Sequence, residues 1–161
     1  MGMDVYGLKP KKNTKQPNVL KVPEGKDWWD SFQKMSEKEK DAYYVAKDKH
    51  YEDNPGIYFR NNVWYWRPLW DYVCKNVCSL TEEDQDHGHS NSGHQVSEEK
   101  AITIAGVLYA LLEDGSVKEA EKMHNKAEAK ANKDVPTYPF TEENVREFAI
   151  FCEESGGFEI C

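Results

Sequence analysis

The chain has 161 residues, 39% of them hydrophobic and 12% aromatic, so it is long enough to bury a core as one domain. Its formal charge of -8 arises after Gly56, because residues 57–161 carry 19 acidic and 10 basic side chains. Sequence-independent binding to nucleic acid depends on Lys and Arg, so this balance argues against duplex nucleic acid as a partner. No apolar run of about 20 residues and no signal peptide is present, so we expect no membrane association and a cytoplasmic location.

The first third of the chain predicts a strand, an irregular connection and a helix. Residues 3–8 alternate imperfectly between apolar and polar, which favours a terminal strand. Residues 9–26 contain three prolines and six lysines, a composition typical of irregular backbone. Ser36 and Glu39 have the spacing of a capping box, which predicts a helix from there to about Glu52.

The aromatic residues 57–66 favour an extended segment, followed by a helix from about Pro68 to Cys78. The alternative is one longer helix, in which Val63, Trp66 and Trp70 form an apolar stripe. That alternative places Pro68 inside a helix, at a cost of roughly 3 kcal/mol. The first interpretation is therefore preferred.

The second half of the chain predicts three helices after a polar loop at residues 79–95. Ser97 is a helix cap, and the apolar helix that follows, ending at Gly115, is expected to be the centre of the core. Residues 116–132 predict a surface helix, because they contain few large apolar side chains. A last helix is expected from Thr141 to Ser155.

These elements predict an α+β fold, with residues 1–161 forming a single, mainly helical domain. A small sheet is expected from the N-terminal, C-terminal and central aromatic segments. Residues 158–161 predict a terminal strand, and its pairing with residues 3–8 would place Val5 near Ile160.

The aromatic segment also predicts a ligand site. In an extended chain alternate side chains share a face, so Arg60, Asn62, Trp64 and Trp66 would point the same way. Flat rings, amides and a guanidinium suit a small anionic, nucleotide-like ligand, and Arg67 and His89 are expected to complete the site. The competing interpretation places the rings in the core and leaves the arginines at the surface.

A second constellation lies in the polar loop, where His87, His89 and His94 fall within eight residues, close to Asp84 and Asp86. Imidazole and carboxylate groups are ligands for divalent metal ions, so these histidines are a candidate metal site. A solvated turn is the competing interpretation.

Motifs for catalysis are absent. The chain has no glycine-rich phosphate loop, no His-Glu-x-x-His and no Gly-x-Ser-x-Gly motif. An enzyme would need scattered groups, such as His89 or His94 as a base oriented by Asp86. We therefore expect a protein without enzymatic activity and without a required cofactor. The four cysteines are expected to be thiols.

Several long motifs resemble a family of small proteins from bacteriophages and bacteria that have no established activity. The motifs are the residues Tyr-Phe-Arg-Asn-Asn-Val-Trp-Tyr-Trp-Arg-Pro-Leu-Trp-Asp-Tyr-Val at 58–73, the Gly-His-Ser-Asn-Ser-Gly loop at 88–93 and the closing Ser-Gly-Gly-Phe-Glu-Ile-Cys at 155–161. The opening segment 3–10 also belongs to the pattern. The resemblance implies a viral or mobile-element origin, and residues 13–56 depart from it as an inserted helical segment.

The leading functional hypothesis is a phage-type binding protein that sequesters a small anionic ligand in the host cytoplasm and so counteracts host defence. One alternative is a metal-dependent hydrolase that uses His87, His89 and His94. The other is an acidic interaction module or inhibitor that binds a basic host protein.

Overall fold

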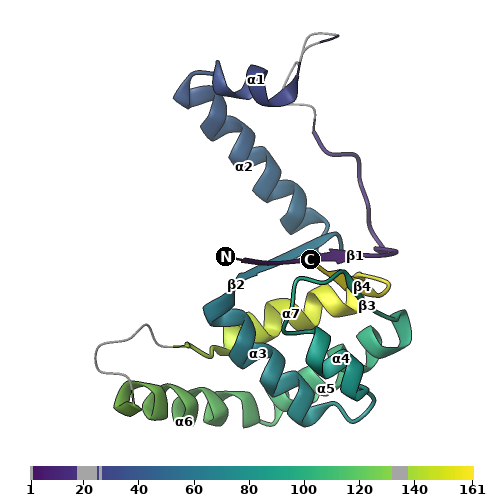
Figure 1. Cartoon of the computed structure of the whole chain (residues 1–161), viewed down its shortest axis with the longest axis vertical. Helices are drawn as coiled ribbons and strands as arrows, with labels where there is room; N and C mark the ends of the chain where they lie inside the picture. The colour runs from purple at the N-terminus through teal and green to yellow at the C-terminus, as the bar shows by residue number, and fades with distance from the viewer. Residues whose placement is uncertain (1, 18–24, 26, 132–137) are drawn as a thin grey trace. The chain divides into compact units, whose positions relative to one another are not determined.

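The computed structural model describes residues 2–17, 25, 27–131 and 138–161, and the chain forms two compact units (Figure 1). The first unit contains the residues up to Lys12 together with Pro55–Cys161, and the second contains Asn13–Asn54. The second unit has nearly the bounds of the helical segment expected at 13–56. Part of the irregular connection at 9–26, and the expected helix end at residue 132, lie outside the described residues.

The first unit is built on a four-stranded antiparallel sheet in the order β2-β1-β4-β3. The strands are β1 (Gly2–Gly7), β2 (Tyr58–Asn62), β3 (His94–Val96) and β4 (Phe158–Ile160). Val5 pairs directly with Ile160, so the expected pairing of the two ends of the chain is confirmed. The fold is α+β and mainly helical, as the sequence predicts.

In the described part of the first unit, five helices accompany this sheet (Figure 1). They are α3 (Val63–Asn76), α4 (Glu82–His87), α5 (Glu98–Glu113), α6 (Ser116–Ala131) and α7 (Glu142–Glu154). The expected core helix, surface helix and last helix correspond to α5, α6 and α7. Only Val117 of α6 is buried, which agrees with its expected place at the surface.

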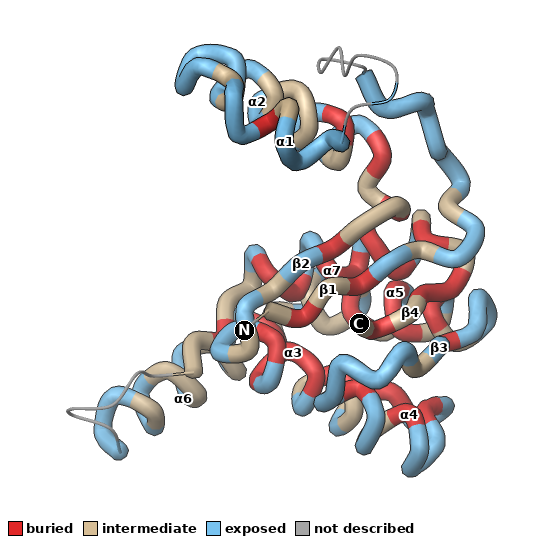
Figure 2. The backbone as a smooth tube through the Cα atoms, turned by 45° about the horizontal axis from the view of Figure 1, so that its top comes forward, coloured by how far each residue is buried: buried red, intermediate tan, exposed pale blue. Residues whose placement is uncertain are grey.

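The core of the first unit lies between one face of the sheet and α3, α5 and α7, where Figure 2 shows many buried residues. Alternate strand residues such as Val5, Phe59 and Phe158 are buried, as the period of a strand requires. The ring of Phe148 on α7 lies 5.1 Å from Phe59 and 5.8 Å from Phe158, measured between centroids. Apolar burial of this kind is the main stabilising term of the fold.

The aromatic segment differs from the preferred prediction. Strand β2 ends at Asn62, and α3 begins at Val63 with Pro68 inside it. The cap explains the start, because the Asn62 side chain accepts hydrogen bonds from the backbone N–H groups of Trp64 and Tyr65. The cost of the internal proline is offset by burial, since Trp66 and its neighbours Leu69 and Trp70 are fully inaccessible to solvent.

The described residues of the second unit form the helices α1 (Trp28–Gln33) and α2 (Glu37–Asp53). The capping box of Ser36 and Glu39 is present at the start of α2, as predicted, whereas α1 was not predicted from the sequence. Phe32 is the buried side chain of α1, and its ring stacks on that of Trp28 at 5.1 Å. None of the helices in the described part of the chain has an apolar stretch long enough to span a bilayer.

Candidate metal centre

The segment predicted as a polar loop, residues 79–95, contains helix α4 and strand β3. Helix α4 begins after a capping box in which the Thr81 hydroxyl accepts from the Asp84 backbone N–H, and the Asp84 carboxylate accepts from the Thr81 backbone N–H. The pattern Thr-x-x-Asp was visible in the sequence and is the signal that could have revealed this helix. The loop prediction was therefore wrong for these two elements.

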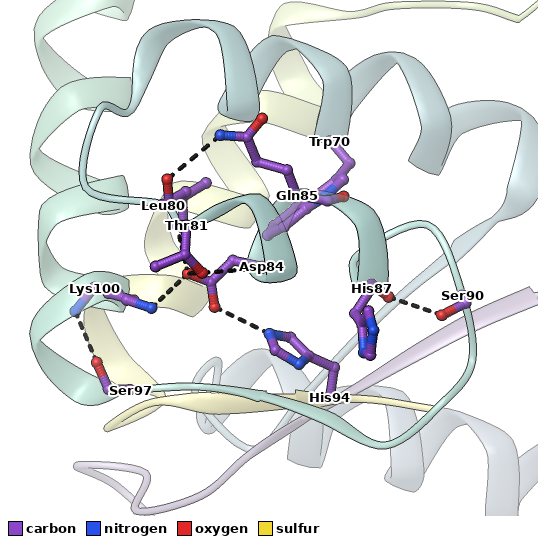
Figure 3. Close-up of polar contacts among 10 residues, drawn as sticks. All are labelled: Trp70, Leu80, Thr81, Asp84, Gln85, His87, Ser90, His94, Ser97 and Lys100. Carbon is purple, nitrogen blue, oxygen red and sulfur yellow. Dashed lines mark hydrogen bonds and ion pairs between the residues drawn. The ribbon is translucent and has the colours of Figure 1, made fainter.

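The centre of the site is the carboxylate of Asp84, which is only 3% exposed (Figure 3). One carboxylate oxygen, Oδ2, accepts hydrogen bonds from the backbone and hydroxyl of Thr81 and from the ammonium group of Lys100. The other, Oδ1, lies 3.0 Å from Nε2 of His94. Burial raises the pKa of Asp84, but the hydrogen bonds from Lys100, Thr81 and His94 outweigh it and hold this pKa well below its ordinary value.

The contact with Asp84 fixes the proton arrangement of His94. An ionised carboxylate only accepts hydrogen bonds, so Nε2 of His94 carries the proton that points at Asp84. In the neutral ring the other nitrogen, Nδ1, then has a free lone pair. Metal-binding histidines typically donate their second nitrogen to a carboxylate in this way, which orients the ring and makes it a better ligand.

Two further side chains that could act as metal ligands lie next to His94. Glu83 and His87 are four residues apart on α4 and therefore share one face of the helix. One ligand atom from each of Glu83, His87 and His94 can be chosen so that all three lie within 4.8 Å of one another. The rings of His87 and His94 are 5.2 Å apart between centroids. Glu83 and His87 are exposed, so both side chains have room to turn towards an ion, which requires metal–ligand distances of about 2.0–2.2 Å.

The position of α4 is set by two tryptophans of α3. The indole N–H of Trp66 donates to the backbone oxygen of Gly88 at 2.7 Å, and that of Trp70 donates to the backbone oxygen of Gln85 at 3.1 Å. These carbonyls belong to the last turn of α4 and its cap, where the helix leaves acceptors unsatisfied. The buried aromatic residues therefore hold in place the helix that presents His87.

Comparison with family models, with curated proteins and with solved structures found no match. The resemblance to phage and bacterial proteins stays a prediction.

The predicted metal residues are only partly brought together. His87 and His94 converge, but Nε2 of His89 lies 3.2 Å from a carboxylate oxygen of Asp71 on α3. Glu83 takes the third place, and Asp84, not Asp86, orients a histidine. Neither role could be assigned without knowing that α4 exists, since only the helix places residues 83 and 87 side by side.

The predicted ligand-site residues do not form one site. Arg60 is exposed and lies 3.5 Å from the Asp4 carboxylate, while the side-chain oxygen of Asn62 is used as the cap of α3. Both line an open hollow that also contains the carboxylates of Glu143 and Glu147. The hollow therefore contains two carboxylates, and its arginine already faces the carboxylate of Asp4. This charge distribution does not favour the binding of an anion.

The remaining predicted residues lie elsewhere. Trp66 is fully buried, so its ring is unavailable for stacking on a ligand, and the competing interpretation of core packing holds for this residue. The Trp64 ring lies 4.9 Å from that of Tyr138, and the guanidinium of Arg67 donates to the Tyr138 hydroxyl at 3.1 Å. The expected alternation of one face fails because the strand becomes a helix after Asn62.

Proposed function

We propose that the chain binds one divalent transition metal ion through Glu83, His87 and Nδ1 of His94. Two imidazoles and one carboxylate are borderline and hard ligands, a set that suits zinc better than calcium or magnesium. The observation that carries the proposal is the contact between Nε2 of the part-buried His94 and the buried Asp84 carboxylate, which leaves Nδ1 as the ring nitrogen available to a metal (Figure 3). The neighbouring Glu83 and His87 donors complete the set.

The environment of Asp84 supports a role beyond packing. A buried carboxylate is costly unless it is paired, and here Lys100 and Thr81 supply the pairing on one oxygen. The second oxygen remains available to His94. Asp84 is thus a positioning residue, which keeps the His94 ring in one tautomer and one orientation before a metal arrives.

Isothermal titration calorimetry with zinc tests the proposal on protein freed of metal with a chelator. We expect one zinc ion per chain, and a loss of affinity in His87→Ala and His94→Ala larger than the 10- to 100-fold typical of losing an outer partner. His89→Ala is the matched control, because this histidine lies against Asp71 of α3, outside the cluster of Glu83, His87 and His94, and the change should leave the affinity unaltered. Equal losses in His87→Ala and His89→Ala, or no binding by the wild type, would reject the proposal.

The same geometry favours metal-dependent hydrolysis as a second candidate function. Three protein ligands leave a coordination position for water or substrate, as in catalytic zinc sites, and both Glu83 and His87 are open to solvent. Ester hydrolysis measured with p-nitrophenyl acetate should then increase on adding zinc, and the increase should disappear in His87→Ala. An increase of equal size in that variant contradicts the hydrolase and leaves the binding proposal to the calorimetry.

A further inference from the structure

A groove outside the metal centre runs between α3 and α6. It consists of two hollows of about 340 and 330 Å³ that share Pro68, Asp71 and His124. The larger hollow is lined mainly by apolar groups, which come from α3, α6 and the segment before α7. Its apolar lining residues are Pro68, Tyr72, Ala120, Met123 and Phe140. Hollows of this size and composition suit a small molecule.

The walls of the groove are held by specific contacts. The Tyr72 and Phe140 rings lie 4.9 Å apart between centroids. Phe140 is fixed through its backbone, because the Asn125 side chain both donates to its oxygen and accepts from its N–H. Nε2 of His124 donates to the backbone oxygen of Tyr138 at 2.7 Å. The groove is thus formed in the free protein and does not need a ligand to organise it.

The acidic and basic side chains along the groove differ in whether they already have a bonding partner. Arg67, Asp71 and Lys75 are spaced four residues apart and so form one row on α3. Asp71 lies against His89, and Glu128 accepts from the backbone N–H of Tyr138. Among the residues that the structure describes, neither Lys75 nor Arg67 forms an ion pair, and Arg67 donates a hydrogen bond to the neutral Tyr138 hydroxyl. In the larger hollow, Lys75 is therefore the charged group left to pair with a ligand.

We infer that this groove binds a small amphipathic anion, with its apolar body against Tyr72, Ala120 and Phe140 and its acidic group at Lys75. Met123 is 74% exposed beside the hollow, and a bound apolar body would cover it. A flexible thioether adapts well to a ligand of irregular shape. This ligand has the same charge as the anion expected from the sequence. Of the residues that were predicted to bind that anion, only Arg67 lines the groove.

The probe for this inference is naphthalene-1-acetate, whose neutral partner of the same shape is naphthalene-1-acetamide. Binding is measured by calorimetry and by ¹H–¹⁵N NMR of the full chain. We expect the acid to bind at least tenfold more tightly than the amide and to shift the amide signals of Tyr72, Ala120 and Phe140. Equal affinities, or shifts confined to other parts of the chain, overturn the inference.

Two variants test separately how much the charge of Lys75 and the apolar wall of the groove contribute to binding. Lys75→Gln should weaken binding of the acid at least fivefold, whereas Lys118→Gln, the same change at an exposed position of α6 outside the groove, should not. Ala120→Leu should abolish binding by filling the hollow. Retention of binding in Ala120→Leu, or equal weakening in both lysine variants, rejects the site. Urea unfolding of each variant serves as the folding control, so this test does not depend on whether the metal centre binds zinc.

Discussion

Gly88 lies directly against the indole ring of Trp70. A Cβ atom at position 88 would meet the ring carbon Cε2 at 2.0 Å, far inside van der Waals contact. The backbone oxygen of the same glycine accepts the hydrogen bond from Trp66, so a single residue joins the end of α4 to both core tryptophans. This close packing connects the core of the first unit to the orientation of His87.

Gly88→Ala should therefore unfold more easily and bind zinc more weakly. Overpacking of this kind costs about 1–3 kcal/mol, because Trp70 is fully buried and has no free space to enter. Urea unfolding gives the loss of stability. Gly106→Ala is the matched control: this glycine lies in α5, nothing beyond the adjoining backbone of that helix lies within 4 Å of its Cβ position, and the change should stabilise by about 0.5–1 kcal/mol. A neutral Gly88→Ala would mean that α4 is not held against Trp70.

Asp84→Asn tests the buried carboxylate. The variant keeps the shape of the side chain but removes the charge that faces Lys100 and His94, and hydrogen bonds to charged groups contribute about 1.5–3 kcal/mol. We expect a loss of that order in urea unfolding and a 10- to 100-fold loss of zinc affinity. Asp86→Asn makes the same change at an exposed position of α4. If both variants lose affinity equally, the effect is one of net charge and not of His94 orientation.

A pH dependence is expected at Glu147, away from the metal centre. Partial desolvation of this largely exposed side chain, and then repulsion from Glu143, raise the pKa of its carboxyl group above the ordinary value. A raised pKa means that folding favours the protonated form, so this stabilising contribution is present below the ordinary pKa of about 4.3 and is lost as pH rises through the folded value.

Glu147→Gln should therefore be more stable than the wild type at pH 7, and the difference should shrink towards pH 4. Urea unfolding at the two pH values measures it, and the effect should be small because the side chain is exposed. A difference that is the same at both pH values would show that the charge of Glu147 is not its cause.

Local signals predicted much of the fold. Alternation and position indicated the terminal strands that pair Val5 with Ile160, and the serine caps indicated α2 and α5. The start of α3 was missed because Pro68 argues against a helix in any local analysis. Its cost is outweighed by burial of Trp66, Leu69 and Trp70, and that burial depends on helices far away in the sequence.

The candidate site was predictable in its residue types but not in its geometry. His87 and His94 were visible as potential ligands, yet nothing local separates them from His89. The choice depends on Asp71 of α3, which faces His89, and on Lys100 of α5, which neutralises Asp84. Both are tertiary contacts, and tertiary contacts of this kind decide which histidines come together with Glu83.

The most direct test of the metal centre is long-range ¹H–¹⁵N NMR of the histidine rings during titration with zinc, since it reports each ring nitrogen separately. We expect the ¹⁵N signals of Nδ1 of His94 and of one nitrogen of His87 to shift on binding, while Nε2 of His94 keeps its proton and its hydrogen bond to Asp84. Zinc-induced shifts at His89 in place of His87, or coordination through Nε2 of His94, would contradict this expectation.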